Sequence, residues 1–209
     1  MKGFVTVSEA VPDVILEIRY HSTFNFVGER VDGYDEPVAI LTCEAAAALK
    51  KASDAAIVLG FRLKVYDAFR PQRAVDHFVR WAEDAGDVRM KPYFYPQVDK
   101  ARLFEEGYIA KKSGHSRGST VDVTLVDMLS GTDIDMGGAF DYFGHLSHPD
   151  CAEGLSEKQI ENRMLLRKLM VDAGFRPLDT EWWHFTLVNE PYPDTYFDFA
   201  LQTKKDPAL

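Results

Sequence analysis

The sequence predicts an α+β fold, with a mainly antiparallel sheet and helices packed on it. Apolar strand-like segments and helix-like segments follow one another along the chain, and glycine-containing turns between strands indicate hairpins, which connect antiparallel strands. The 209 residues are enough for one domain with a hydrophobic core. Since no repeat or linker divides the chain, we expect a single domain over residues 1–209.

The first elements are short strands followed by a long helix. Residues 1–40 read as strands and loops, and VILEIRY (14–20) has the apolar density of a strand. The alanine-rich segment 42–60 has helical periodicity, and Thr42 can cap it. We expect Cys43 to be a small buried residue at the start of this helix.

The middle of the chain continues the alternation. RLKVYDAF (62–69) predicts a strand, and Pro71 suits the first turn of a helix that runs to Gly86. Residues 87–98 are irregular and aromatic, and 99–107 predicts a short helix that ends in glycine.

The last elements include the clearest ones. TVDVTLVD (120–127) alternates as a strand should, and 128–141 reads as a turn followed by a glycine-rich loop. Residues 156–174 predict a helix capped by Ser156, and 182–187 predict an aromatic strand.

Composition excludes several classes of protein. A formal net charge of −9 disfavours nucleic acid as a partner but not a divalent cation or a zwitterion. Two distant cysteines, Cys43 and Cys151, form neither a disulfide framework nor a cysteine-rich zinc site. No apolar run of signal-peptide or membrane-spanning length is present, so we expect a cytoplasmic protein without a membrane partner.

The segment SGHSRGSTVDVTL contains the first candidate metal ligands, His115 and Asp122. On the predicted strand, Asp122 faces away from the valines around it, and a carboxylate in mid-strand is costly to bury without a cation or another partner. The alternative is that Asp122 pairs with Arg117 and His115 is an ordinary loop residue. This segment alone does not decide between the two.

The segment EWWH adds Glu181 and His184. Alone, it is better explained as an aromatic core strand with a solvated glutamate. Combined with His115 and Asp122, it provides two imidazoles and one carboxylate, as a catalytic zinc requires, and leaves Glu181 free as a general base. Arg70 lies between a strand and the Pro71 helix, where it can stabilise an oxyanion or merely form an ion pair with Asp67.

The chain resembles the VanX-type D-alanyl-D-alanine dipeptidases, zinc peptidases of the D,D-peptidase/hedgehog fold group. The resemblance covers nearly the whole chain. The matching segments, in chain order, are RYHSTFNFVGERVDGY, YDAFRPQRAV, SGHSRGSTVDVTL, MGGAFD, EWWHF and EPYPDTYFDF.

The resemblance implies one zinc ion per chain and a role for each matching residue. It implies His115, Asp122 and His184 as zinc ligands and Glu181 as the catalytic acid and base. It also implies Arg70 as the group that stabilises the transition state. The implied substrate contacts are Tyr20, Ser113 and Asp141, the last two near the amino group or the carboxylate of the dipeptide.

Two residues depart from the family pattern near the site. Gly114 stands where some relatives have serine, and Thr120 stands at a position often held by alanine. Both can shift substrate preference, although neither is an implied ligand or base. The segment 144–154 compares weakly, so no role is assigned to His145 or His148.

The expected substrate is free D-alanyl-D-alanine or a similar D,D-dipeptide, because a site that pairs with both charged ends rejects longer chains. Lids from 87–98 and 128–155 would close such a site. The alternatives are a D,D-carboxypeptidase or endopeptidase acting on wall peptides, a non-catalytic zinc-binding module, and a structural reading without metal. The oligomeric state stays open, a homo-oligomer included, as does the role in glycopeptide resistance, wall turnover or scavenging.

Overall fold

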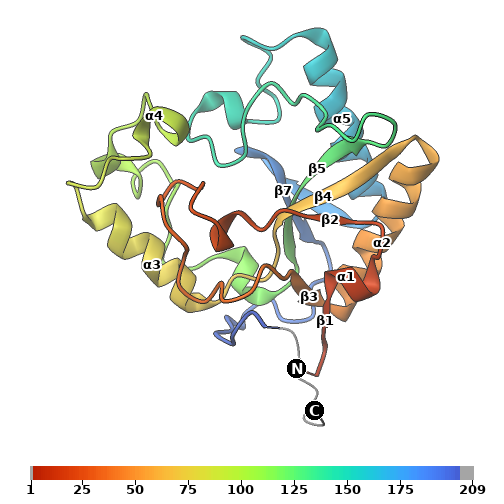
Figure 1. Ribbon diagram of the computed structural model, residues 1–209, viewed down its shortest axis with the longest axis horizontal. Helices are drawn as coiled ribbons and strands as arrows, with labels where there is room; N and C mark the ends of the chain where they lie inside the picture. The colour runs from red at the N-terminus through yellow and green to blue at the C-terminus, as the bar shows by residue number, and fades with distance from the viewer. Residues whose placement is uncertain (1, 203–209) are drawn as a thin grey trace.

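The computed structural model describes residues 2–202 and has the predicted α+β architecture (Figure 1). The strands are β1 (Phe4–Thr6), β2 (Ile15–Leu16), β3 (Ile40–Thr42), β4 (Phe61–Asp67), β5 (Thr120–Asp127), β6 (Phe175–Leu178) and β7 (Glu181–Leu187). The α-helices are α1 (Val7–Ala10), α2 (Cys43–Val58), α3 (Gln72–Glu83), α4 (Lys91–Phe94) and α5 (Glu157–Asp172). The described residues also form four short 3-10 helices: η1 (Arg19–His21), η2 (Lys100–Arg102), η3 (Gly114–Arg117) and η4 (His145–Ser147).

The central sheet has the strand order β2-β4-β5-β7-β6. Its β2–β4 pair is parallel and its other pairs are antiparallel, which confirms the expected mainly antiparallel sheet. A separate small sheet pairs β1 with β3. No helix among the described residues is long and apolar enough to cross a bilayer.

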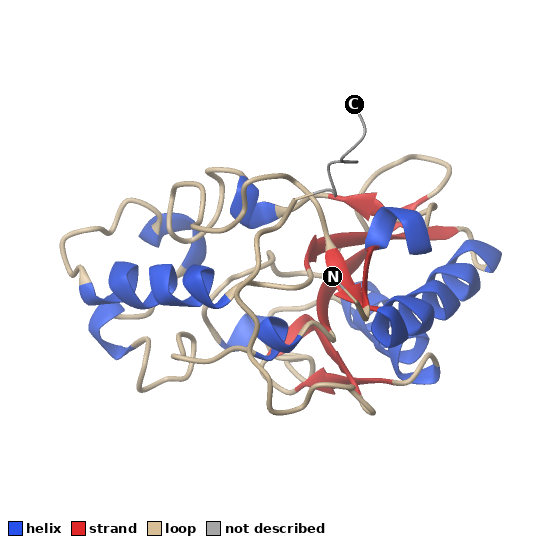
Figure 2. Cartoon of the chain, turned by 90° about the horizontal axis from the view of Figure 1, so that it is seen from below, coloured by secondary structure: helices blue, strands red, loops and turns tan. Residues whose placement is uncertain are grey.

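The sheet separates two layers (Figure 2). The long helices α2 and α5 pack together on one face, against β4 and β6. Val121, Val123 and Leu125 of β5 are fully buried in the hydrophobic core. Shorter helices and loops, including α3 and α4, lie on the opposite side of the molecule (Figure 1). Because successive strand residues point to opposite faces, Asp122 and Thr124 project from the face opposite these apolar residues.

Local sequence explains the best-predicted helices. Thr42 caps α2, and its hydroxyl accepts a hydrogen bond from Ala45 N at 3.3 Å. Ser156 begins α5 with a full capping box, in which Gln159 N donates to Ser156 Oγ at 3.3 Å and Gln159 Oε1 accepts from Ser156 N at 2.8 Å. The long strands of segments 62–69, 120–127 and 182–187 are confirmed, as β4, β5 and β7.

Other predictions were wrong in part. The strand expected at 14–20 is only two residues long, because the chain turns at η1 to bury Tyr20. The helix expected at 99–107 is the single turn η2. Tertiary contacts outweigh local propensity there: Lys100 Nζ donates to Asp84 O at 2.7 Å and lies 4.1 Å from the Trp81 ring centroid.

Three features of the fold differ from the sequence interpretation. Cys43 begins α2 as predicted but is exposed, because the buried face of α2 is formed by alanines and Leu49. The segment 87–98, expected to be irregular, contains the short helix α4. The strand β6 was not predicted: it lies at the sheet edge and contains Pro177, which strands tolerate at edges.

Candidate functional site

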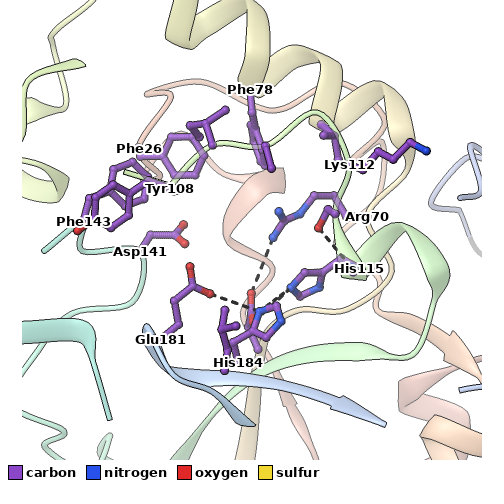
Figure 3. Close-up of a pocket in the computed structure, with 18 of the residues that line it drawn as sticks. Phe26, Arg70, Phe78, Tyr108, Lys112, His115, Asp141, Phe143, Glu181 and His184 are labelled. Carbon is purple, nitrogen blue, oxygen red and sulfur yellow. Dashed lines mark hydrogen bonds and ion pairs between the residues drawn. The ribbon is translucent and has the colours of Figure 1, made fainter. Parts of the chain in front are cut away.

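A cavity of about 270 Å³ lies beside the sheet, and every predicted site residue lines it (Figure 3). Its polar lining includes Tyr20, Arg70, Ser113, His115, Asp122, Asp141, Glu181 and His184. Its apolar wall includes Phe26, Phe78, Tyr108 and Phe143. The cavity is slightly smaller than typical drug-sized ligand sites of roughly 300–1,000 Å³, so it suits a small substrate.

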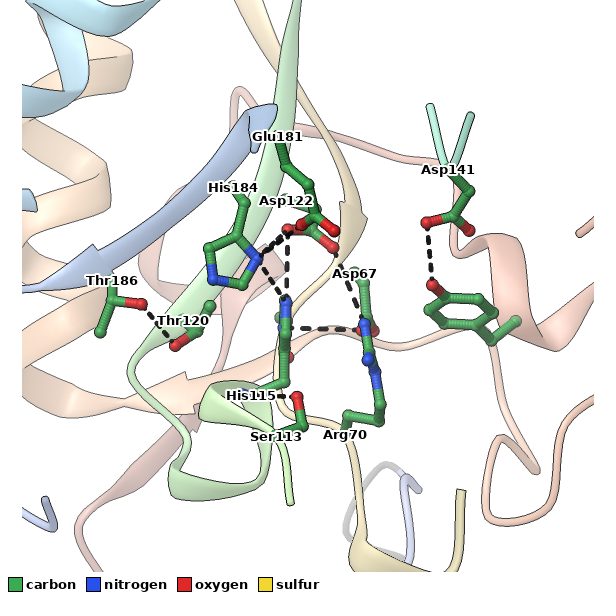
Figure 4. Close-up of polar contacts among 12 residues, drawn as sticks. Asp67, Arg70, Ser113, His115, Thr120, Asp122, Asp141, Glu181, His184 and Thr186 are labelled. Carbon is green, nitrogen blue, oxygen red and sulfur yellow. Dashed lines mark hydrogen bonds and ion pairs between the residues drawn. The ribbon is translucent and has the colours of Figure 1, made fainter. Parts of the chain in front are cut away.

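Three potential ligand atoms converge at one end of this cavity (Figure 4). His115 Nε2 lies 3.3 Å from His184 Nδ1 and 3.3 Å from Asp122 Oδ1. His184 Nδ1 lies 3.1 Å from Asp122 Oδ1. The structure therefore brings together the two histidines and the aspartate that the sequence singled out as ligands.

Sheet register explains how two of these residues meet. Asp122 of β5 is directly paired with His184 of β7, so their side chains project together from one face of the sheet. A one-residue slip would turn one of them to the opposite face.

The third residue, His115, is delivered by the turn η3. Ser113 caps this turn, accepting from His115 N at 3.2 Å, and Gly118 ends it at φ +81°. A Cβ atom on Gly118 would come within 2.3 Å of the Phe4 ring, so both the backbone conformation and the space require glycine. Arg70 N donates to His115 O at 3.3 Å, which ties this turn to the segment that carries Arg70.

The tautomer of His115 is fixed by its second ring nitrogen. His115 Nδ1 lies 2.7 Å from Ala68 O, and a carbonyl oxygen can only accept, so Nδ1 carries the hydrogen. In the neutral form of the ring, Nε2 then carries the lone pair and faces Asp122 and His184. A backbone carbonyl that orients a histidine in this way is typical of metal sites.

The donor set fits a zinc ion. A tetrahedral zinc with bonds of about 2.0–2.1 Å has ligand atoms about 3.3 Å apart, which matches the three separations observed here. Asp122 Oδ1 is buried and makes no aligned hydrogen bond, although buried polar atoms are nearly always satisfied. A cation between the three residues would satisfy this oxygen.

Electrostatics around the three residues also favour a cation. Burial opposes ionisation of Asp122, but the neighbouring imidazoles of His115 and His184 hold its pKa below the usual range. Burial likewise opposes a charge on His184. The carboxylates of Asp122 and Glu181 outweigh burial and raise the pKa of His184 to about 9. These carboxylates therefore favour a positive charge at this place, which either a proton or a metal ion can supply.

Glu181 lies beside the convergence point rather than within it. It is the first residue of β7, and its Oε2 is 3.3 Å from His184 Nδ1. Its side chain is 29% exposed and directed into the cavity (Figure 3). A partly solvated carboxylate next to a metal site can exchange protons with bound substrate and with solvent.

Arg70 is held in the cavity by an acid and two rings. Its Nε and Nη2 both lie 2.9 Å from Asp67 Oδ2, and its Nη2 is 3.9 Å from Asp122 Oδ2. The guanidinium carbon lies 4.9 Å from the Tyr20 ring centroid and 5.1 Å from that of Phe78. Arg70 therefore forms the ion pair with Asp67, and this pair holds its guanidinium group inside the cavity.

The three predicted substrate contacts line the same cavity. Tyr20 donates a hydrogen bond to Asp141 Oδ1 at 3.1 Å, while Asp141 Oδ2 is buried without a partner. Burial raises the pKa of Asp141 well above the usual range, and Asp122 adds to this effect. Asp141 also has φ +61°, which is uncommon for a residue other than glycine. Ser113 accepts from a backbone amide and keeps its own hydroxyl hydrogen for a ligand.

Sequence reasoning missed one residue that supports the site, Asp67. It also predicted two lid segments, of which only one lines the cavity. Asp67 contacts Arg70, accepts from Tyr34 Oη at 2.7 Å, and lies 3.5 Å from His115 Nδ1. The sequence shows Asp67 three residues before Arg70, but its contact with His115 arises only in the folded chain. Of the two expected lids, 128–155 contributes Asp141 and Phe143, whereas no residue of 87–98 lines this cavity.

Comparisons with known proteins agree on one family. The family model described as D-Ala-D-Ala dipeptidase, of the peptidase M15 group, matches residues 1–202. A D-alanyl-D-alanine dipeptidase of Enterococcus faecalis is 42% identical over 95% of this chain and 98% of its own. A D-alanyl-D-alanine dipeptidase of Streptomyces coelicolor is 43% identical over 95% of this chain and 98% of its own. One of Enterococcus faecium is 39% identical over 96% of this chain and 98% of its own. The chain therefore belongs to the peptidase M15 family of D-Ala-D-Ala dipeptidases.

Proposed function

We propose that this protein is a zinc-dependent dipeptidase that hydrolyses free D-alanyl-D-alanine and similar D,D-dipeptides. The observation that carries the proposal is the convergence of His115 Nε2, His184 Nδ1 and Asp122 Oδ1, 3.1–3.3 Å apart, with Glu181 beside them. Family membership supports the same activity. His115, Asp122 and His184 would hold one zinc ion per chain. Zinc, when bound, lowers the pKa of water and polarises a carbonyl group.

The chain's own residues would move the proton and stabilise the developing charge. Glu181 accepts a proton from the attacking water and returns it to the nitrogen of the leaving amino acid. Arg70 donates hydrogen bonds to the carbonyl oxygen as negative charge accumulates there. Asp67, Tyr20 and Phe78 keep the guanidinium in place, so little reorganisation is needed during the reaction.

The cavity also supports selection for a free dipeptide. The unpartnered Oδ2 of Asp141 is an acceptor for the substrate ammonium group, and Tyr20 orients this carboxyl group. The Ser113 hydroxyl can donate to the other end of the substrate. An N-acylated substrate has no ammonium group and would gain no ion pair with Asp141, so it should bind more weakly than the free dipeptide.

The test compares wild type with variants on a panel of D,D-, L,D- and L,L-dipeptides and N-acetyl-D-Ala-D-Ala. Glu181→Ala should retain about one zinc per chain, measured by elemental analysis, but lose turnover by about 10²–10⁴-fold. His115→Ala and His184→Ala should lose both metal and activity. Glu83→Ala, which removes an exposed glutamate outside the cavity, is the matched control.

Arg70→Lys separates the role of the guanidinium from that of its charge. The variant should bind zinc normally and show kcat lowered by about 10²–10³-fold, the usual effect of removing a donor to an oxyanion. Rapid cleavage of L,L-dipeptides, or preference for the N-acetylated substrate, would contradict the substrate assignment. Full turnover by Glu181→Ala would contradict the mechanism.

A further inference from the structure

The segment EPYPDTYFDF (190–199) takes part in the resemblance to the dipeptidase family, yet the proposed reaction gives it no role. We name it the C-terminal segment. It follows β7, and none of its residues lines the cavity of the candidate site. Its contacts include η3, the turn that carries His115, and the start of α3. Any influence of this segment on the site must therefore act through these neighbours.

A buried ion pair joins the C-terminal segment to η3. Arg117 Nε lies 2.8 Å from Glu190 Oε2, and Arg117 Nη2 lies 2.9 Å from Glu190 Oε1, so the contact is bidentate. The side chains of Arg117 and Glu190 are only 14% and 7% exposed. Arg117 ends η3, two residues after His115, so its partner is Glu190 and not Asp122, which the sequence left open as an alternative. The pair fixes the place of η3 relative to the chain that leaves β7.

The ring of Tyr196 contacts both flanks of η3. Its centroid lies 4.8 Å from Lys112 Nζ and 5.8 Å from the guanidinium carbon of Arg117. A cation at such a distance from an aromatic face is attracted to it. Lys112 precedes the turn and Arg117 ends it, so one side chain of the C-terminal segment holds the turn of His115 at both ends.

The backbone of Phe197 adds hydrogen bonds to both neighbours. Phe197 N donates to Ser116 O at 2.8 Å, and Phe197 O accepts from Gln72 N at 3.0 Å. Ser116 directly follows His115, and Gln72 is the first residue of α3. These two bonds seat the C-terminal segment between η3 and α3. The stretch of chain that carries Glu190 therefore has a fixed place against the turn of His115.

Aromatic rings anchor the C-terminal segment itself. The ring of Phe199 stacks on that of Phe69, the residue before Arg70, with the centroids 4.0 Å apart and the planes inclined by 13°. The ring of Phe4 meets those of Phe197 and Phe199 edge-on, each at 5.1 Å. Such packing gives the segment a firm base from which its polar contacts can hold η3.

We propose that Arg117 and Glu190 are positioning residues of the candidate metal site, and that they act on His115 through η3. The inference rests on the proposed function. Metal ligands must lie within about 0.2 Å of their ideal distances, so a turn that moves even slightly loses affinity for the ion. Without the carboxylate of Glu190, the guanidinium of Arg117 would be buried without its partner, and η3 would shift to expose it. His115 would then move relative to Asp122 and His184.

Glu190→Gln keeps the shape of the side chain and removes its charge, and zinc affinity is the readout. Competition with a chelator should show the Kd for zinc raised about tenfold, as expected for a residue that supports a metal ligand. Asp198→Asn is the matched control, because Asp198 pairs with Arg73 of α3 at 2.8 Å and both side chains are 46% exposed. This control should leave the Kd for zinc within about twofold of wild type, whatever its effect on Tm, because exposed ion pairs contribute little.

A double-mutant cycle tests whether the two residues act through one contact. Arg117→Gln should weaken zinc binding by about the same factor as Glu190→Gln, and the double variant should bind zinc no more weakly than either single variant. The proposal is overturned if the single variants bind zinc like wild type, if their effects multiply in the double variant, or if Asp198→Asn weakens binding equally. A wild-type protein that binds no zinc would overturn the proposed function as well, whereas unchanged affinity in Glu190→Gln overturns this inference alone.

Discussion

At the scale of single residues, a proton on His184 Nδ1 and a metal ion bound by His184 and Asp122 exclude each other. Burial opposes a charge on the imidazole, but the carboxylates of Asp122 and Glu181 raise the pKa of His184 to about 9 in the metal-free protein. A protonated imidazole cannot ligate a metal. We therefore expect metal binding near pH 7 to release this proton.

Zinc binding should release about one proton from His184 at pH 7 and progressively less above pH 9. Apparent affinity should thus rise about tenfold per pH unit below pH 9, apart from zinc hydrolysis. Calorimetry in buffers of different ionisation enthalpy measures the proton count. A proton count of zero at pH 7 would contradict the electrostatic description of the site.

The same shift predicts the pH dependence of metal-free stability. Because the folded pKa lies above the unfolded value of about 6.5, the stabilisation is complete below pH 6.5 and is lost as pH rises to about 9. Chemical denaturation of the chelated protein across this range provides the measurement, with His184→Gln as the control that should remove this dependence.

Gly114 and Thr120, the two departures from the family pattern, are in contact. A Cβ atom on Gly114 would lie 3.1 Å from Thr120 Oγ1, closer than ordinary packing allows. Thr120 Oγ1 also shares a hydrogen bond with Thr186 Oγ1 at 2.9 Å. The small residue at 114 therefore makes room for the larger one at 120.

We expect Gly114→Ala and Thr120→Ala each to destabilise the fold, by about 1 kcal/mol for the threonine because the Thr186 hydroxyl loses its partner. The double variant should cost less than the sum, with a coupling of at least about 0.5 kcal/mol. Urea denaturation of the four proteins completes the cycle. Strict additivity would mean that the contact does not constrain position 114.

At the scale of elements, the site depends on the pairing of β5 with β7, while α5 supports the sheet from the other side. The capping box of Ser156 and Gln159 lies outside the cavity that holds the candidate site. Ser156→Ala should therefore lower the free energy of unfolding by about 1 kcal/mol and leave zinc content and kcat unchanged. Lys158→Ala, on the exposed first turn, is the control and should have little effect. A loss of zinc in Ser156→Ala would mean that α5 positions the site more directly.

Sequence patterns predicted those elements that carry strong local signals. The alternation in 120–127 and the caps Thr42 and Ser156 led to β5, α2 and α5. They failed where tertiary contacts prevail: Lys100 donates to the carbonyls of Asp84 and Asp87, and only the single 3-10 turn η2 forms within 99–107.

The candidate site, like the fold, was predictable from the sequence only in part. Residue chemistry and the family resemblance identified the candidate metal ligands, base, arginine and substrate contacts, all of which line the cavity of the candidate site, but not its apolar wall. They did not identify Asp67 as the support shared by Arg70 and His115, because that role arises only when β4 and η3 are adjacent in space.

At the scale of the whole molecule, a metal ion would link the neighbouring segments η3 and β5 to β7, which lies much further along the chain. Chelation should therefore lower Tm by about 10 °C, because an ion present at a thousand times its Kd stabilises the folded state by about 4 kcal/mol. Scanning calorimetry with and without EDTA measures the difference. His184→Ala, which should bind no zinc, is the control whose Tm must not respond to EDTA.

The position of β7 has a consequence for biosynthesis. Among the described strands it is the last in sequence, yet it inserts between β5 and β6 and carries His184 to Asp122. A nascent chain on the ribosome thus emerges with His115 and Asp122 long before their partner exists. Zinc uptake at this site would therefore await the last strand, because an incomplete chain lacks both His184 and Glu181.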